Sequence, residues 1–354
     1  MRQVFYLSAL TAAWILTPAQ AALTPAQATE AARLLSSSEP TDRASAVKTV
    51  RGQGVSVHKA YLPLLEKAQS VHQERLETSI SEGLSVLNKF DQAHQEWVTA
   101  RDACLLTVFE KTGKDSQKLV GLGSSYAAAD KAMQDVSRSM EIPPGSLTVW
   151  RDTAAALNEL DAEIHWCLNT AESQQNSWRG QSAEERAGKI PNGPEFLRMT
   201  GIYQERLGAR TAMEMVKHFN GKEIRWSTPE LTAFMELINS RRYTLGQETL
   251  RLDERLSRSA YGHSEAMQRL EFFSHQSPIE GHKTPWDRAK KAEFEGTCTG
   301  ENIYMGSTAP EAAYKAWWES DGHRFIMFKK DVNTLGLGVA GNYWTLNIGQ
   351  RIWP

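Results

Sequence analysis

The run Trp317-Trp318-Glu319-Ser320-Asp321-Gly322-His323-Arg324 (residues 317–324) is the most informative segment of this 354-residue chain. Before it, Pro310 stands at the start of an apolar stretch, as expected for the first turn of a helix. After it come two apolar runs, 335–340 and 343–348, separated by Gly341-Asn342. Such a dipeptide is typical of a hairpin turn, so the pattern predicts a helix followed by two antiparallel strands.

Further motifs lie in order on the N-terminal side of this run. Gly300-Glu301-Asn302-Ile303 precedes the helix, and Phe273-Ser274-His275-Gln276-Ser277-Pro278 precedes that tetrapeptide. Two amphipathic helices are expected earlier still, the first starting at Ser227-Thr228-Pro229-Glu230. Together with Leu335-Gly336-Leu337-Gly338-Val339, these segments resemble a CAP (SCP) domain of the cysteine-poor bacterial branch, covering residues 228–354.

The resemblance implies an α-β-α sandwich with a surface cleft lined by two histidines and two glutamates. Matched position by position, His275 is the first histidine, Glu301 the first glutamate and His323 the second histidine. The second glutamate position falls on Ser320 here, with Glu319 one residue early. The resemblance therefore predicts a binding site of His275, Glu301, His323 and Ser320, without the complete set of four.

Several chemistries suit such a site. His275 and His323 could hold a divalent metal such as zinc or magnesium, and a metal-bound water could then become a hydroxide. Without a metal, Glu301 and His323 are the candidate acid–base pair. The alternative is that these residues only fix a turn by hydrogen bonding. His263 lies on an apolar helix stripe and is expected to be buried and structural, whereas His282 is expected in a solvated loop.

Residues 22–221 are predicted to form an all-α helical bundle. A long stretch from about residue 64 carries apolar residues at a spacing of three and four, and Gly113 separates it from a second helix over about 115–140. Pro143-Pro144-Gly145 then breaks the chain before a third helix. This region is the candidate surface for homo-oligomer formation.

The three cysteines are Cys104, Cys167 and Cys298. If the third helix turned back beside the first, Cys167 would come within about two turns of Cys104, at about 1.5 Å per residue. We therefore predict a disulfide between Cys104 and Cys167.

The first residues predict export. Arg2, an apolar run and Ala19-Gln20-Ala21 have the layout of a secretory signal peptide over residues 1–21, cleaved before Ala22. No later stretch is apolar enough to span a bilayer. The formal net charge of -2 provides no basic excess for nucleic acid. We expect a secreted or periplasmic protein.

Three classes of function stay open. The first is an exported binding protein whose cleft takes a small ligand, lipid, peptide or envelope component. The second is a metal-dependent, peptidase-like hydrolase that uses the same cleft. The third is a structural envelope protein that acts through its helical region. The family resemblance favours the first class, although a fold does not fix a function.

Overall fold

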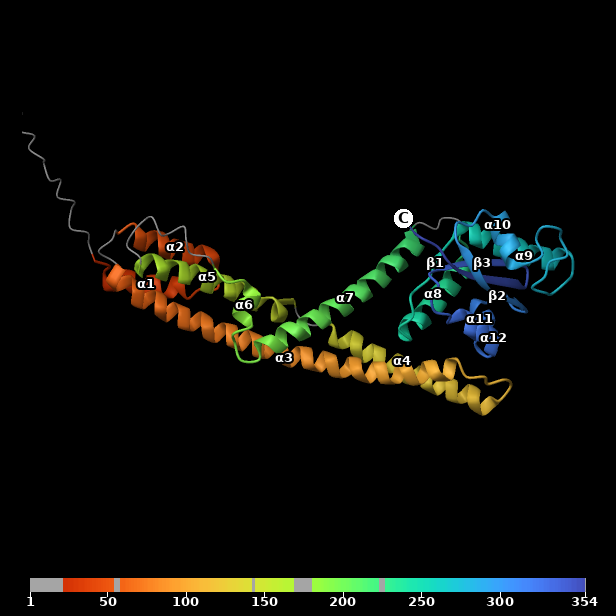
Figure 1. Cartoon of the computed structure of the whole chain (residues 1–354), viewed down its shortest axis with the longest axis horizontal. Helices are drawn as coiled ribbons and strands as arrows, with labels where there is room; N and C mark the ends of the chain where they lie inside the picture. Colours follow the sequence, from red (N-terminus) through yellow and green to blue (C-terminus); the bar gives the residue numbers. More distant parts are fainter. Residues whose placement is uncertain (1–21, 54–57, 142–143, 169–179, 223–226, 354) are drawn as a thin grey trace, which may run out of the picture. The chain divides into compact units, whose positions relative to one another are not determined.

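The structure is a computed structural model, and it describes residues 22–53, 58–141, 144–168, 180–222 and 227–353. Contacts divide the chain into two compact units, one made of residues 1–86 and 143–200, the other of residues 87–142 and 201–354. The predicted signal peptide lies outside the described residues. Figure 1 shows the order of the elements along the chain.

The first unit is helical. It contains α1 (Pro25–Leu35), α2 (Pro40–Arg51), the first part of α3 (His58–Val108), a 3-10 helix (Pro144–Leu147), α5 (Val149–Leu168), α6 (Ala183–Ala187) and the start of α7 (Gly193–Lys222). Thr24 begins α1 with a capping box that also involves Gln27. Buried Leu35, Tyr61, Leu65 and Leu160 join α1, α3 and α5 in one apolar core.

The predicted disulfide was wrong, because all three cysteines are free thiols. Cys167 lies in the core of the first unit with Tyr61 and Leu65, whereas Cys104 lies in the core of the second unit. The third helix does not turn back as the prediction assumed. α5 instead runs beside the first half of α3, where Gln69 donates a 2.7 Å hydrogen bond to Asp161.

The second unit is built on a four-stranded sheet with the strand order β1-β3-β4-β2. Its strands are β1 (Arg251–Leu252), β2 (Thr297–Met305), β3 (Thr334–Ala340) and β4 (Tyr343–Gln350). The predicted hairpin is confirmed, since β3 and β4 pair antiparallel and Gly341 has φ +55° in the turn. β2 also pairs antiparallel with β4, at the edge of the sheet.

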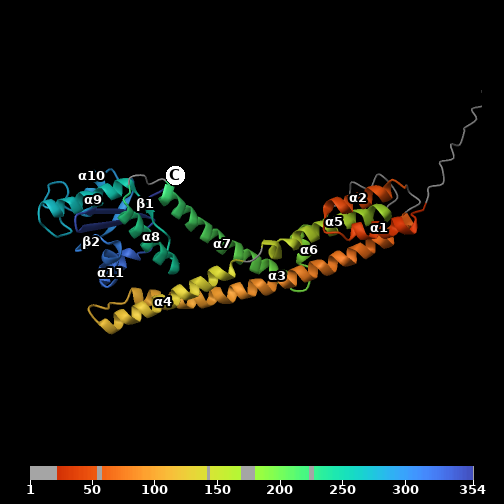
Figure 2. The ribbon, with the colours of Figure 1, turned by 180° about the vertical axis from the view of Figure 1, so that it is seen from behind.

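Helices cover both faces of this sheet, as the two opposite views show (Figures 1 and 2). α9 (Glu254–Arg269) and α10 (Pro285–Lys291) lie on one side, and α8 (Pro229–Thr244), α11 (Pro310–Trp318) and α12 (Asp321–Met327) lie on the other. This is the predicted α-β-α sandwich.

Two strand glycines let α9 approach the sheet closely. A Cβ atom at Gly336 would lie 2.3 Å from the backbone of Leu256, and one at Gly338 would lie 2.1 Å from the backbone nitrogen of Tyr261. No side chain fits at either position, because such distances are far below van der Waals contact. The glycine-rich strand is therefore required by packing rather than by a bound phosphate.

The opposite face is closed by aromatic side chains. Phe234 of α8 packs edge-to-face on Trp317 of α11 with ring centroids 5.3 Å apart, and it also contacts Trp344 of β4. The indole nitrogen of Trp317 donates a 3.0 Å hydrogen bond to the carbonyl of Ile303 on β2. This hydrogen bond links α11 to β2, the edge strand that carries Glu301.

The helical hairpin formed by the end of α3 and α4 (Ser116–Ser139) belongs to the second unit. Cys104, Val108 and Leu122 of the hairpin share one buried core with Phe234 and Trp317. The compact units therefore divide differently from the predicted segments 22–221 and 228–354. The reason is that an apolar face of the hairpin is buried on the C-terminal domain.

A buried arginine joins the hairpin to α12. Arg324 is 0% exposed, and its guanidinium donates to the carbonyls of Val108 (2.8 Å), Glu110 (2.9 Å) and Trp318 (2.7 Å). Two of these carbonyls are at the C-terminal end of α3, which a cation stabilises. Asp321 completes the contact by accepting from Arg324 and from the backbone N–H groups of Thr112 and Gly113.

We predict that Arg324→Ala lowers the free energy of unfolding of the second unit by about 3 kcal/mol or more, because buried carbonyls lose their donors and a cavity remains. Urea unfolding followed by tryptophan fluorescence measures this change. The exposed Arg269→Ala on α9 serves as the control and should change the free energy by less than about 0.5 kcal/mol. Equal effects of the two substitutions would contradict the assigned role of Arg324.

Candidate functional site

The predicted site residues gather around the edge strand β2. His275 lies in the loop after α9, Glu301 lies on β2, and Ser320 and His323 lie at the start of α12. Glu301 and Asn302 are consecutive on β2, so their side chains point to opposite faces of the sheet. Glu301 faces α9 and α10, whereas the Asn302 amide donates a 2.9 Å hydrogen bond to the carbonyl of His323. The two halves of the site thus meet across one strand.

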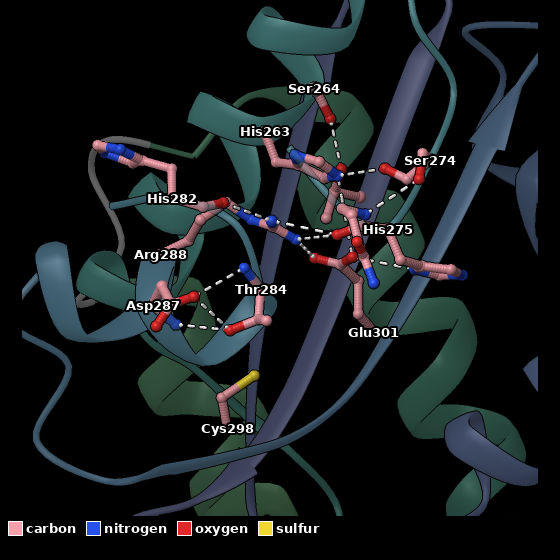
Figure 3. Close-up of polar contacts among 12 residues, drawn as sticks. His263, Ser264, Ser274, His275, His282, Thr284, Asp287, Arg288, Cys298 and Glu301 are labelled. Atoms are coloured by element: carbon pink, nitrogen blue, oxygen red, sulfur yellow. Dashed lines mark hydrogen bonds and ion pairs between the residues drawn. The ribbon is translucent and has the colours of Figure 1, made fainter. Parts of the chain in front are cut away.

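Glu301 is the centre of the first half. Its side chain is only 2% exposed, and each of its oxygens has a partner. Oε2 accepts a 2.6 Å hydrogen bond from Arg288, and Oε1 lies 3.0 Å from Nδ1 of His275. Figure 3 shows these contacts converging on Glu301. Because Nδ1 of His275 faces a carboxylate, it carries a hydrogen and donates it to Oε1 of Glu301.

Arg288 was not identified from the sequence. Its side chain is 3% exposed, and besides Glu301 it binds the backbone carbonyls of His275 (3.2 Å), His282 (3.0 Å) and Lys283 (3.2 Å). It therefore holds the loop that carries His275 (Figure 3). The available signal was the capping box Thr284–Asp287, which starts a short helix and places Arg288 in its first turns.

His263 is buried, as predicted. Its Nε2 lies 2.9 Å from the carbonyl of Ser274 and 3.9 Å from Oε1 of Glu301. Burial lowers the pKa of His263 to about 4, so the ring is neutral near pH 7. Since Nε2 faces a carbonyl, Nε2 carries the hydrogen and fixes the end of the His275 loop.

His323 forms the second half of the site with Ser320. Nδ1 of His323 lies 2.8 Å from the Ser320 hydroxyl, and either atom can be the donor. Burial lowers the pKa of His323, and the neighbouring His275 lowers it further. His323 is therefore neutral near pH 7.

Glu301 is unsuited to complete the metal site that was predicted on His275 and His323. Both oxygens of Glu301 are occupied, and the nearest partner is Arg288, whose fixed positive charge repels a divalent cation. Nδ1 of His275 is also occupied by Glu301. Within the described parts of the chain, no group of three or more His, Cys, Asp and Glu residues is arranged to hold a metal ion.

Comparison with known proteins identifies the C-terminal domain. Residues 235–348 match the Cysteine-rich secretory protein family, CAP. The chain is 37% identical over 113 residues to the uncharacterized protein YkwD of Bacillus subtilis, covering 31% of this chain and 43% of that protein. It is 29% identical over 167 residues to the uncharacterized membrane protein YlbC of the same organism, covering 46% of this chain and 48% of that protein.

A solved structure is also similar. An extracellular protein containing a SCP domain from Bacillus anthracis shares 28% identity with this chain, covers 35% of it and 44% of its own length, and gives a TM-score of 0.33. The C-terminal domain of this chain is a CAP domain. The chain spans less than half the length of the two curated relatives that it matches. No helix among the described residues is long and apolar enough to cross a membrane.

We predict that zinc or magnesium produces no saturable rise in the melting temperature of the protein, because the carboxylate that could complete a site on His275 and His323 is already paired with Arg288. A thermal-shift titration up to millimolar metal measures this. A saturable rise that disappears in His275→Ala/His323→Ala would contradict this assignment and restore the metal site.

The buried neutral His263 predicts a pH dependence of stability. Its folded pKa of about 4 lies below the ordinary value of about 6.5, so between these values only the unfolded chain takes up the proton. Stability should therefore fall as the pH falls from about 6.5 to 4, by up to about 3 kcal/mol from this residue. Urea unfolding at several pH values should show a shallower fall in His263→Gln than in the wild type and in the control His282→Gln. Parallel profiles for all three proteins would refute this contribution.

Proposed function

We propose that this chain is an exported binding protein whose CAP domain recognises a polar component of the cell envelope through His275, His323 and Ser320. The observation that carries the proposal is the pairing of Glu301. Because both of its oxygens are held by Arg288 and His275, Glu301 positions the site rather than reacting in it. The groups left for a ligand are hydrogen-bonding groups.

The chemistry of the exposed atoms defines the ligand class. The side chain of His275 is 50% exposed, and its Nε2 has no partner among the residues described. Nε2 accepts a hydrogen bond from a hydroxyl or amide group, and the Ser320–His323 pair can donate or accept another. These atoms suit a neutral ligand rich in hydroxyl and amide groups, as in a cell-wall polymer.

Two observations support export. The predicted signal peptide at residues 1–21 has the charge, apolar run and small residues of a cleaved leader. One similar solved structure belongs to a protein described as extracellular. A protein that acts in the envelope would meet a cell-wall ligand without crossing a membrane.

A hydrolase that uses the same cleft would need a general base or a metal-bound hydroxide near the substrate. Glu301 has no free oxygen for the first role, and its pairing with Arg288 disfavours the second. We therefore keep the hydrolase only as a possible result of the binding experiment described next. A hydrolase would release soluble fragments from the cell-wall material.

A sedimentation assay with purified cell-wall sacculi tests the proposal. We expect the wild-type protein to co-sediment with saturation, and we expect His275→Ala/His323→Ala to lose most of this binding because its two ring acceptors are gone. His282→Ala is the matched control, since that half-buried ring lies in the same loop and its Nδ1 faces the backbone carbonyl of Glu280. Equal sedimentation of the wild type and the double variant would contradict the proposal. Released soluble fragments would replace it with the hydrolase.

A further inference from the structure

A large groove of the second unit lies away from the His275 site. It has a volume of about 1230 Å³, and neither His275, Glu301 nor His323 lines it. Its walls come from α3, α4 and α7 on one side and from the end of the CAP domain, including Arg251 and Trp353, on the other. A groove of this size is large enough for a ligand of lipid dimensions.

The walls of this groove are held in place at both ends of the α7 segment. At one end, Tyr203 packs edge-to-face on Phe90 of α3, and its hydroxyl donates to the carbonyl of Met140 at 3.3 Å. At the other end, the Asn220 side chain donates to the carbonyl of Leu250 and accepts from the N–H of Leu252, both at 3.0 Å. Specific contacts therefore fix the walls of the groove within the second unit.

The charge in the groove is predominantly positive. Arg206 and Arg210 are half-buried on α7 one turn apart, and the guanidinium of Arg251 lies 5.3 Å from the ring centroids of both Phe219 and Trp353. None of these three arginines has an ion pair within the described parts of the chain. Arg101 and Arg351 also line the groove, but acidic side chains already neutralise them. These three guanidinium groups are therefore without a salt bridge in the described residues, although the charge of Asp91 partly opposes the lowering of the Arg206 pKa by burial.

Between these charges the groove is apolar and adaptable. Met133 of α4 and Met140 at its C-cap line it together with Met213 and Val216 of α7. Methionine side chains are flexible and fit ligands of irregular shape. His94 also lines the groove and is only 7% exposed, yet its buried Nδ1 has no hydrogen-bond partner among the described residues. A buried polar atom without a partner is costly, and a bound ligand would relieve that cost.

We infer that this groove binds an anionic lipid, with its carboxylate or phosphate on Arg206 and Arg210 and its acyl chain along the methionine wall. The argument is charge complementarity, because unpaired arginines bind carboxylate and phosphate oxygens by paired hydrogen bonds. The adjoining apolar wall favours an acyl chain over a free phosphate. This site is separate from the proposed cell-wall site and does not rest on it.

Titration of the delipidated full chain with defined probes tests this inference. The probes are oleate, 1-oleoyl-lysophosphatidylglycerol and the neutral monoolein, each below its micellar concentration, and the signal is tryptophan fluorescence, to which Trp97 and Trp353 in the groove contribute. We expect saturable one-to-one binding of at least one anionic probe and about tenfold weaker binding of monoolein. The probe that binds more tightly distinguishes a carboxylate head group from a phosphate.

Variants locate the binding. Arg206→Gln/Arg210→Gln should weaken binding of the anionic probe by about tenfold. Arg258→Gln/Arg269→Gln removes the same charge from exposed positions on α9 and should leave binding unchanged. Val216→Trp should weaken binding by filling the groove. Circular dichroism melts check that each variant is folded.

The inference is overturned by equal affinity for monoolein, by no saturable binding of any probe, or by equal losses in the two double-arginine variants. The cell-wall proposal is tested by a different set of measurements. His275→Ala/His323→Ala should keep its lipid binding, and Arg206→Gln/Arg210→Gln should keep its sedimentation with sacculi. The two sites can therefore be judged separately.

Discussion

The contact of Arg324 and Asp321 with the tip of the α3–α4 hairpin is the constraint on which the second unit depends. The guanidinium of Arg324 donates hydrogen bonds to carbonyls at the end of α3, and the carboxylate of Asp321 accepts hydrogen bonds from the backbone N–H groups of Thr112 and Gly113. The adjacent hydrogen bonds of Thr112 and Arg324 lower the pKa of Asp321 well below its ordinary range. The pair thus remains charged, and it joins the CAP domain to the hairpin across a buried contact.

The same short run of sequence serves the candidate site. Ser320 and His323 lie on either side of Asp321 in the sequence. The segment that binds the hairpin through Asp321 and Arg324 therefore also positions the imidazole of His323. On the other side of β2, Arg288 holds Glu301 and the His275 loop. Each half of the site is therefore positioned by a buried arginine. The exposed ring of His275 is the part left for a ligand.

Much of the C-terminal domain could be predicted from the sequence. Gly341-Asn342 predicted the hairpin, and the family resemblance carried by the motifs around Glu301 and His323 implied the sandwich. The capping box could place Arg288 on a helix, but its pairing with Glu301 could not be predicted, because Glu301 is 13 residues away and only the fold brings the two side chains together. The disulfide failed for a related reason. Pro143-Pro144 shows that a helix ends, but not whether the next helix turns back or continues along its neighbour.

Hydrogen–deuterium exchange across the hairpin tests most directly whether the hairpin and the CAP domain form one folded unit. In the wild type, peptides covering residues 104–126 should be protected nearly as well as β3 and β4, because their core and hydrogen bonds are shared. In Asp321→Ala, this protection should fall at the hairpin tip while β3 and β4 keep theirs. Rapid exchange of the hairpin in the wild type, or no change in the variant, would contradict the account.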